Sequence, residues 1–250
     1  MKKLIFSTVL LFSLVVFSQT PDKLFSKANG LYKSGKYEKA IELYLIIEKQ
    51  GLQSDDLYFN LGNCYYKLNK VAPSIYFYEK ALKINPVNDD VITNLAFAKR
   101  MTIDVIEELP KTFLQKFSEN VIQKLPFDSW AIIAVIASFL VSILFLFYYF
   151  SDSSKMKLLY FNSSILALFI LIVSVFFAFK NYNTVQNNKT AIIFSVKVAI
   201  KNAPTFSSEE VFTLHEGTKV IVVDELDNWK KIKLADGKIG WVYSDKLKVI

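Results

Sequence analysis

The chain has 250 residues, of which 52% are apolar and 15% aromatic, and its formal net charge is +7. The basic residues are scattered among acidic ones instead of forming a stripe, which argues against nucleic acid as a partner. A single cysteine and a single histidine exclude an intrachain disulfide, a cysteine metal cluster and a Cys/His or Ser/His/Asp catalytic arrangement. We therefore expect no enzyme activity, no catalytic residue, no metal and no cofactor.

The first residues have the pattern of a secretory signal peptide. Two lysines precede an apolar run at residues 4–17, and Val16-Phe17-Ser18 fits a small-residue cleavage site. Whether residues 1–18 are removed or kept as an anchor, we expect them to send the following chain across a membrane.

A 34-residue period runs through residues 21–108. Ala40 and Ser74 lie 34 residues apart, and so do Tyr44 and Tyr78. Small residues at such positions allow paired helices to cross closely, and aromatic residues fill the gap to the next pair. The pattern resembles the tetratricopeptide (TPR) repeat, which implies an all-α solenoid, here of two repeats and a capping helix.

The TPR resemblance also implies a binding groove lined by the first helix of each repeat. The family's groove positions, carried over one by one, are Phe25, Asn29, Tyr32 and Lys33, then Phe59, Asn63, Tyr66 and Lys67. These amide, aromatic and cationic groups fit an extended peptide of acidic or carboxylate character. The family's carboxylate-binding members have a lysine where this chain has Phe25, which speaks against chaperone C-termini. The alternative is that these side chains are solvated and bind nothing.

Residues 109–128 form an amphipathic segment. The apolar positions recur at helical spacing: Leu114, Phe117, Val121, Ile122 and Leu125. Two interpretations remain open, a helix that lies on the membrane surface with Trp130 at the headgroups, or a last helix packed on the solenoid.

Two apolar runs follow, at residues 130–150 and 158–179, and neither contains Asp, Glu, Lys, Arg or His. At about 1.5 Å per residue each reaches roughly 31 Å, the thickness of the hydrocarbon core of a bilayer. Residues 151–157 are too few for a folded unit, so we expect a transmembrane hairpin with a cytoplasmic loop and both flanks outside the cytoplasm. Without a charge inside the spans, a pump, channel or proton relay has no support.

Short β-type runs separated by turns occupy residues 190–250. We expect strands at 192–200, 211–214, 218–223, 229–234 and 239–243. The segment resembles the bacterial SH3 (SH3b) domain, which implies a small all-β SH3-like barrel that binds cell-wall peptides or envelope proteins. The expected groove residues are Asn202, Pro204, Trp229 and Tyr243. Trp241 is expected in the core, Trp229 in the core or the groove, and His215 in a solvated turn.

The order of these parts resembles the BatE-type proteins of the bacterial aerotolerance (Bat) operon. The fold class expected is therefore a multidomain membrane protein. The resemblance implies an inner-membrane scaffold of a Gram-negative cell, with TPR and SH3b modules in the periplasm. Implied partners are other membrane proteins, namely von Willebrand factor A-domain proteins, and indirectly a MoxR-type ATPase. The alternative is a membrane protein whose SH3b domain binds peptidoglycan.

Overall fold

The computed structural model describes residues 20–187 and 189–250, so the expected signal peptide lies outside the described residues. The chain divides into two compact units, one ending at Gln53 and the other running from Ser54 to Ile250.

The first unit is an antiparallel helix pair, α2 (Pro21–Lys33) and α3 (Tyr37–Lys49). Pro21 stands at the start of α2, where its missing N–H costs no hydrogen bond. Asp22 in the first turn and Lys33 in the last complement the helix dipole. The two helices bury facing apolar side chains, which are Leu24 and Ala28 on α2, and Ala40, Ile41, Tyr44 and Ile47 on α3.

The second unit begins with α4 (Asp55–Lys67), α5 (Val71–Ile84) and α6 (Asp89–Lys99). Helices α4 and α5 pair closely at Gly62, because a Cβ there would come within 2.5 Å of the Tyr78 ring. The hydroxyl of Ser74 donates to the Gly62 carbonyl at 3.0 Å. Asn88 caps α6, since its side chain accepts a hydrogen bond from the Val91 N–H at 3.3 Å. The small and aromatic residues of the 34-residue pattern thus lie where the helices cross.

The amphipathic segment forms a shorter helix than expected. It consists of α7 (Phe113–Phe117), which runs directly into a π-helical turn, η1 (Ser118–Ile122). Thr112 caps α7, and its backbone N–H is in turn bonded to the Gln115 side chain.

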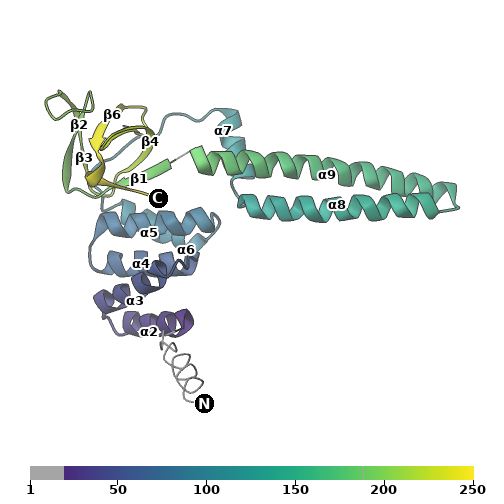
Figure 1. The fold of residues 1–250 in the computed structure, drawn as a ribbon, viewed down its shortest axis with the longest axis horizontal. Coiled ribbons are helices and arrows are strands. Elements are labelled where there is room, and N and C mark those ends of the chain that lie inside the picture. Colours follow the sequence, from purple (N-terminus) through teal and green to yellow (C-terminus); the bar gives the residue numbers. More distant parts are fainter. Residues whose placement is uncertain (1–19, 188) are drawn as a thin grey trace, which may run out of the picture. The chain divides into compact units, whose positions relative to one another are not determined.

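Two long apolar helices follow, α8 (Phe127–Phe150) and α9 (Ser154–Asn187), which lie side by side in opposite directions (Figure 1). Both extend beyond the expected spans, and only residues 151–153 separate them. Within the described part of the chain, these two helices are long and apolar enough to cross a membrane, judged by length and composition. They suggest that the protein associates with a membrane.

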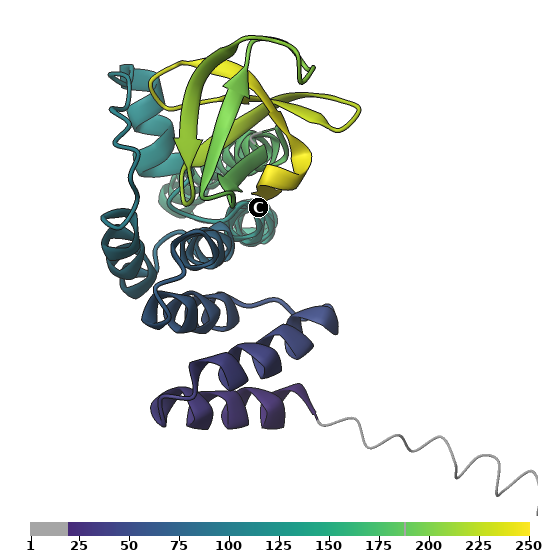
Figure 2. The same ribbon diagram turned by 90° about the vertical axis from the view of Figure 1, so that its left-hand side faces the viewer.

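The second unit ends in an antiparallel sheet of seven short strands that curls into an open barrel (Figure 2). The strands are β1 (Lys189–Ile193), β2 (Lys197–Lys201), β3 (Glu210–His215), β4 (Lys219–Leu226), β5 (Trp229–Lys233), β6 (Ile239–Tyr243) and β7 (Leu247–Val249). Their order in the sheet is β3-β2-β6-β5-β4-β1-β7.

The barrel departs from the sequence prediction in its first strand. The run expected as one strand at 192–200 forms two, β1 and β2, with the chain turning between them. Gly240 on β6 allows the close approach of β2, because a Cβ at this position would overlap the side chain of Ile200. The barrel core is made of Ala191, Ile193, Ile200, Leu214, Val220, Val222, Ile232, Leu234, Val242 and Leu247.

Candidate functional site

The four expected groove residues of the first repeat lie on α2. The hydroxyl of Tyr44 donates to Oδ1 of Asn29 at 2.5 Å, and the ring of Phe25 packs edge-on against Tyr44, with centroids 5.7 Å apart. The ring of Tyr32 packs edge-on against Tyr37. Lys33 is exposed. Three of the four side chains thus help to hold α2 against α3.

The second repeat has the same arrangement on α4. The hydroxyl of Tyr78 donates to Oδ1 of Asn63 at 2.6 Å, and the ring of Phe59 lies 6.1 Å from that of Tyr78. Oδ1 of Asn63 accepts a second hydrogen bond, at 2.8 Å, from Nδ2 of Asn94 on α6. Because two bonds use both lone pairs of that oxygen, a ligand could reach only the Nδ2 donor of Asn63. Tyr66 is half-buried and Lys67 is exposed on the same helix.

Helix α6 and Arg100, the residue that follows it, add two groups that the sequence analysis missed. The guanidinium carbon of Arg100 lies 5.3 Å from the centre of the exposed Phe97 ring. Phe97 follows Asn63 by 34 residues, so the repeat period was the signal that could have found it. Helices α4 and α6 run in the same direction, since each is antiparallel to α5. Tyr66, Lys67, Phe97 and Arg100 therefore provide aromatic and cationic groups at the C-terminal ends of parallel helices.

The barrel carries an aromatic cluster, defined by Phe206, Trp229 and Tyr243. The Phe206 ring lies 4.9 Å from Trp229 and 5.3 Å from Tyr243, and these two lie 5.6 Å apart. Phe206 is 71% exposed, whereas Trp229 is 8% exposed. The structure thus brings two expected groove residues, Trp229 and Tyr243, into contact with Phe206, which the sequence analysis missed.

The expected residues Asn202 and Pro204 lie in the loop that carries Phe206. This loop is held by the hydroxyl of Ser208, which lies 2.9 Å from the carbonyl oxygens of both Ala203 and Thr205. A short loop closed on itself in this way keeps Phe206 over the cluster.

Of the two barrel tryptophans, Trp241 differs from the expectation. On β6, Gly240 and Val242 face the core, so Trp241 and Tyr243 point to the opposite side and are only half-buried. Trp229 pairs with Tyr243 across β5 and β6, and its ring packs against Phe206 and Tyr243. Trp241 was expected in the core and is not there, because strand alternation turns it outward.

The second repeat and the barrel meet at a buried carboxylate. Glu79 on α5 is 8% exposed, and its Oε2 accepts a hydrogen bond of 2.6 Å from Nζ of Lys219 on β4. Nζ of Lys99 lies 3.2 Å from the other carboxylate oxygen. Burial by itself raises the pKa of Glu79, but the charges of Lys219 and Lys99 outweigh it and hold this pKa below its usual value.

A second carboxylate, that of Asp104, fixes the chain that leaves α6 to the barrel. Its Oδ2 accepts hydrogen bonds from the His215 backbone N–H at 2.7 Å and from the Thr218 hydroxyl at 2.6 Å. Its Oδ1 lies 2.8 Å from Nδ1 of His215. Burial raises the pKa of Asp104, and the hydrogen bonds from Thr218 and His215 more than offset this. His215, expected in a solvated turn, is partly buried at the end of β3.

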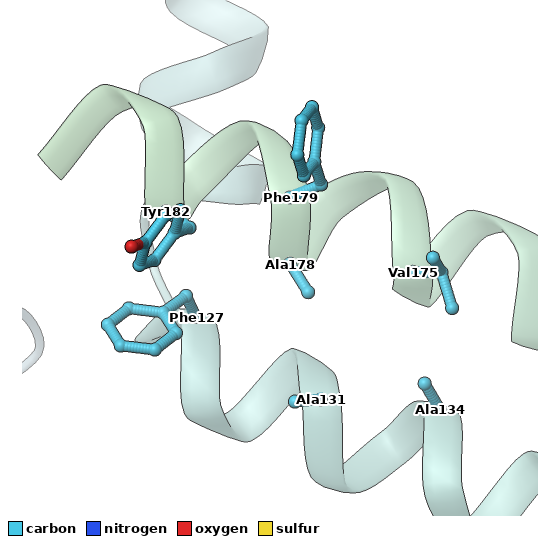
Figure 3. A pocket seen from close by; sticks show the side chains of 7 residues that line it. All are labelled: Phe127, Ala131, Ala134, Val175, Ala178, Phe179 and Tyr182. Atoms are coloured by element: carbon cyan, nitrogen blue, oxygen red, sulfur yellow. The ribbon is translucent and has the colours of Figure 1, made fainter. Parts of the chain in front are cut away.

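The helix pair contains an open groove of about 360 Å³ near the start of α8 (Figure 3). It is lined by Phe127, Ala131, Ala134, Val175, Ala178, Phe179 and Tyr182. In the figure, Phe127 and Tyr182 lie against each other at one end, and the small alanine side chains leave the space between the helices. Across residues 20–187 and 189–250, no three His, Cys, Asp or Glu side chains are grouped to hold a metal ion.

Comparison with known families agrees with this architecture. Residues 197–248 match the bacterial SH3 domain, and residues 56–88 match the tetratricopeptide repeat. The chain therefore carries a TPR repeat and a bacterial SH3 domain. It is also similar to the transcription factor tau 131 kDa subunit of Saccharomyces cerevisiae, with 28% identity over 102 residues. That match covers 36% of this chain and 10% of the yeast subunit.

Proposed function

We propose that this protein is a non-enzymatic membrane scaffold whose TPR and bacterial SH3 modules bind partner proteins outside the cytoplasm. The observation that carries the proposal is the junction at Glu79, where a TPR helix and the barrel meet through a buried ion pair. A fixed junction holds two candidate binding surfaces in one orientation, which is what a scaffold requires. One surface is formed by Tyr66, Lys67, Phe97 and Arg100 and is called here the TPR face. The aromatic cluster of the barrel is the other surface.

Insertion of α8 and α9 into a membrane is supported by what the helices expose. Large apolar side chains cover their outer surface, including Phe139, Ile143, Phe150, Leu158, Phe169 and Ile172. A soluble protein rarely exposes so much contiguous apolar surface, and such a surface marks a site that contacts lipid or another protein. Because the helices form a hairpin, the residues before α8 and after α9 would share one side.

The topology has a direct test. A reporter enzyme that is active only outside the cytoplasm would be inserted after Leu109, after Ile250 or within residues 151–153. We expect activity at the first two positions and none at the third. Activity on one flank alone would contradict the hairpin.

The resemblance to BatE-type proteins supports an inner-membrane location in a Gram-negative cell, a role in aerotolerance or envelope stress, and partners among membrane proteins. The implied partners are von Willebrand factor A-domain proteins and, indirectly, a MoxR-type ATPase. The TPR face would hold the partner in the periplasm, since aromatic and cationic groups suit an extended acidic segment.

The scaffold proposal is tested with a photo-crosslinking amino acid at Tyr66, in the full chain extracted with mild detergent. We expect a crosslink to one von Willebrand factor A-domain protein, and loss of that crosslink when Lys67→Glu is added. The control places the same crosslinker at the exposed Ile46 on α3. Equal crosslinking from both positions, or none from Tyr66, would count against a TPR-held partner.

A second candidate function is attachment to the cell wall, favoured by the exposed ring of Phe206 beside Trp229 and Tyr243. Aromatic surfaces of this kind bind apolar and sugar-like faces with little loss of side-chain entropy. The full chain would be sedimented with isolated sacculi, with Phe206→Ala as the comparison. Binding that depends on Phe206 supports this function, and absence of binding leaves the scaffold as the better account.

A further inference from the structure

The helical segment from Phe113 to Ile122, called here the connecting helix, exposes a row of apolar side chains. Phe113 is 80% exposed and Leu114 is 72% exposed, and Phe117 and Val121 follow on the same face at helical spacing. A patch of large apolar side chains exposed on a folded unit marks a contact that the isolated chain does not show.

Three contacts fix the connecting helix to the ends of α8 and α9. The ring of Phe117 packs edge-on against Phe177 on α9, with centroids 6.3 Å apart. The indole N–H of Trp130 on α8 donates to the Ile122 carbonyl at 2.9 Å. The amide of Asn181 on α9 lies 3.4 Å from the Ile122 carbonyl and donates at 2.7 Å to the carbonyl of Leu125, just beyond the connecting helix. Asn181 is buried, so these bonds satisfy a polar group between apolar helices.

These contacts set the height of the connecting helix along α8 and α9. Trp130 also packs edge-on against Phe177, with centroids 5.0 Å apart. Tryptophan at the end of an apolar span is typical of the level where hydrocarbon gives way to headgroups. The connecting helix is therefore held at this level, beside the end of α9 (Figure 1).

The polar residues within the connecting helix and on either side of it suit the water-facing side of such a boundary. Lys111 lies 2.9 Å from Glu119 and 3.0 Å from Glu108, which orders the start of the segment. Lys116 and Lys124 are exposed and carry the positive charge that favours phosphate headgroups. Apolar side chains on one face and lysines elsewhere define a helix that lies in a membrane interface.

We infer that the connecting helix is an interfacial anchor, with Phe113 and Leu114 inserted at the boundary between lipid headgroups and acyl chains. The inference rests on the proposed insertion of α8 and α9. Such an anchor would limit how the unit that carries the second TPR repeat and the barrel tilts above the bilayer.

The native cysteine makes a site-specific test simple. Cys64 is buried, and burial raises the pKa of its thiol to about 12, so it reacts poorly with thiol reagents. An environment-sensitive fluorophore would be attached to the full chain at Phe113→Cys, Leu114→Cys, Lys116→Cys or Phe139→Cys. The labelled protein is reconstituted into vesicles of phosphatidylethanolamine and phosphatidylglycerol with a quencher on the lipid acyl chains.

We expect labels at positions 113 and 114 to emit at shorter wavelength and to lose most of their emission to the quencher. The label at 116 should stay in water, and the label at 139, in the middle of α8, reports insertion itself. Quenching at 139 with water-like emission at 113 and 114 would overturn the anchor alone. Labels at 113 and 114 that are shielded from water but not quenched would mean that protein covers them, which also overturns it. No quenching at 139 would overturn membrane insertion and the anchor together.

Discussion

Nζ of Lys219 on β4 lies 2.6 Å from Oε2 of Glu79 on α5, and this contact joins two residues that are 140 positions apart in the chain. It places a strand of the barrel against the last complete TPR helix pair. A short solenoid needs a neighbour to cover its terminal face. Here the barrel contributes to that cover, and Tyr76 on α5 adds an edge-on contact with Phe194 after β1.

Replacing Lys219 with Met tests the junction directly. Glu79 would keep only the longer contact to Lys99 while remaining buried, and we expect the free energy of unfolding to fall by about 1–3 kcal/mol. The measurement is urea unfolding of the full chain in detergent, followed by tryptophan fluorescence. Lys197→Met, at an exposed position on β2, is the matched control and should change the free energy by less than about 0.5 kcal/mol. Equal effects of the two substitutions would show that the ion pair contributes nothing.

Stability should fall in acid because of the same carboxylate. The pKa of Glu79 is lower in the folded unit than its usual value of about 4.3, so the unfolded chain binds the proton more readily. The stabilisation is therefore fully present above about pH 5 and is lost as the pH drops through the folded pKa.

Glu79→Gln removes this titration, so the variant should be less stable than the natural chain at neutral pH and lose less stability in acid. Thermal unfolding measured across this pH range checks the expectation. Glu42→Gln, at an exposed position of α3, serves as the control. Parallel curves for the natural chain and Glu79→Gln would exclude Glu79 as a source of the acid sensitivity.

Substitution of Gly240 by Ala should weaken the barrel. The added methyl group would overlap the Ile200 side chain and come within 3.1 Å of the Lys201 carbonyl oxygen, where the backbone cannot easily move. We expect a loss of about 1–3 kcal/mol, typical of overpacking, measured by circular dichroism on heating. Gly30→Ala in α2 is the contrasting case, since nothing lies within 4 Å, and it should stabilise its helix by up to about 1 kcal/mol. A destabilised Gly30→Ala with an unchanged Gly240→Ala would contradict both accounts.

Substitutions in the aromatic cluster should affect ligand binding and folding stability differently. Trp229 is buried, so Trp229→Ala should cost about 3–5 kcal/mol of folding free energy. Phe206 is largely exposed, so Phe206→Ala should cost far less and act mainly on ligand binding. Melting temperatures of the two variants, measured beside binding to sacculi, distinguish these roles. A large loss of stability in Phe206→Ala would make the cluster a structural element.

Part of the candidate site followed from the sequence and part did not. The period that relates Tyr44 to Tyr78 predicted the TPR architecture, and the comparison with known families confirms a TPR repeat. The same pattern offered Asn29 and Asn63 as ligand contacts, whereas both accept hydrogen bonds from those tyrosines. Their role in binding remains a prediction. A repeat pattern shows which positions are restricted in residue type. It does not show whether the restriction comes from packing between helices or from contact with a ligand.

The sequence by itself determined what depends on neighbours along the chain. A local pattern of apolar residues is enough to show which face of an element is removed from water. The helical periodicity, the alternation in the strands and the two long apolar runs are patterns of this kind. The tertiary structure alone decided that Lys219 and Lys99 meet at Glu79, that His215 faces Asp104 and that Phe206 packs over Trp229. Such contacts join single residues from distant segments. Because each depends on how the chain folds in space, it produces no periodic pattern in the sequence.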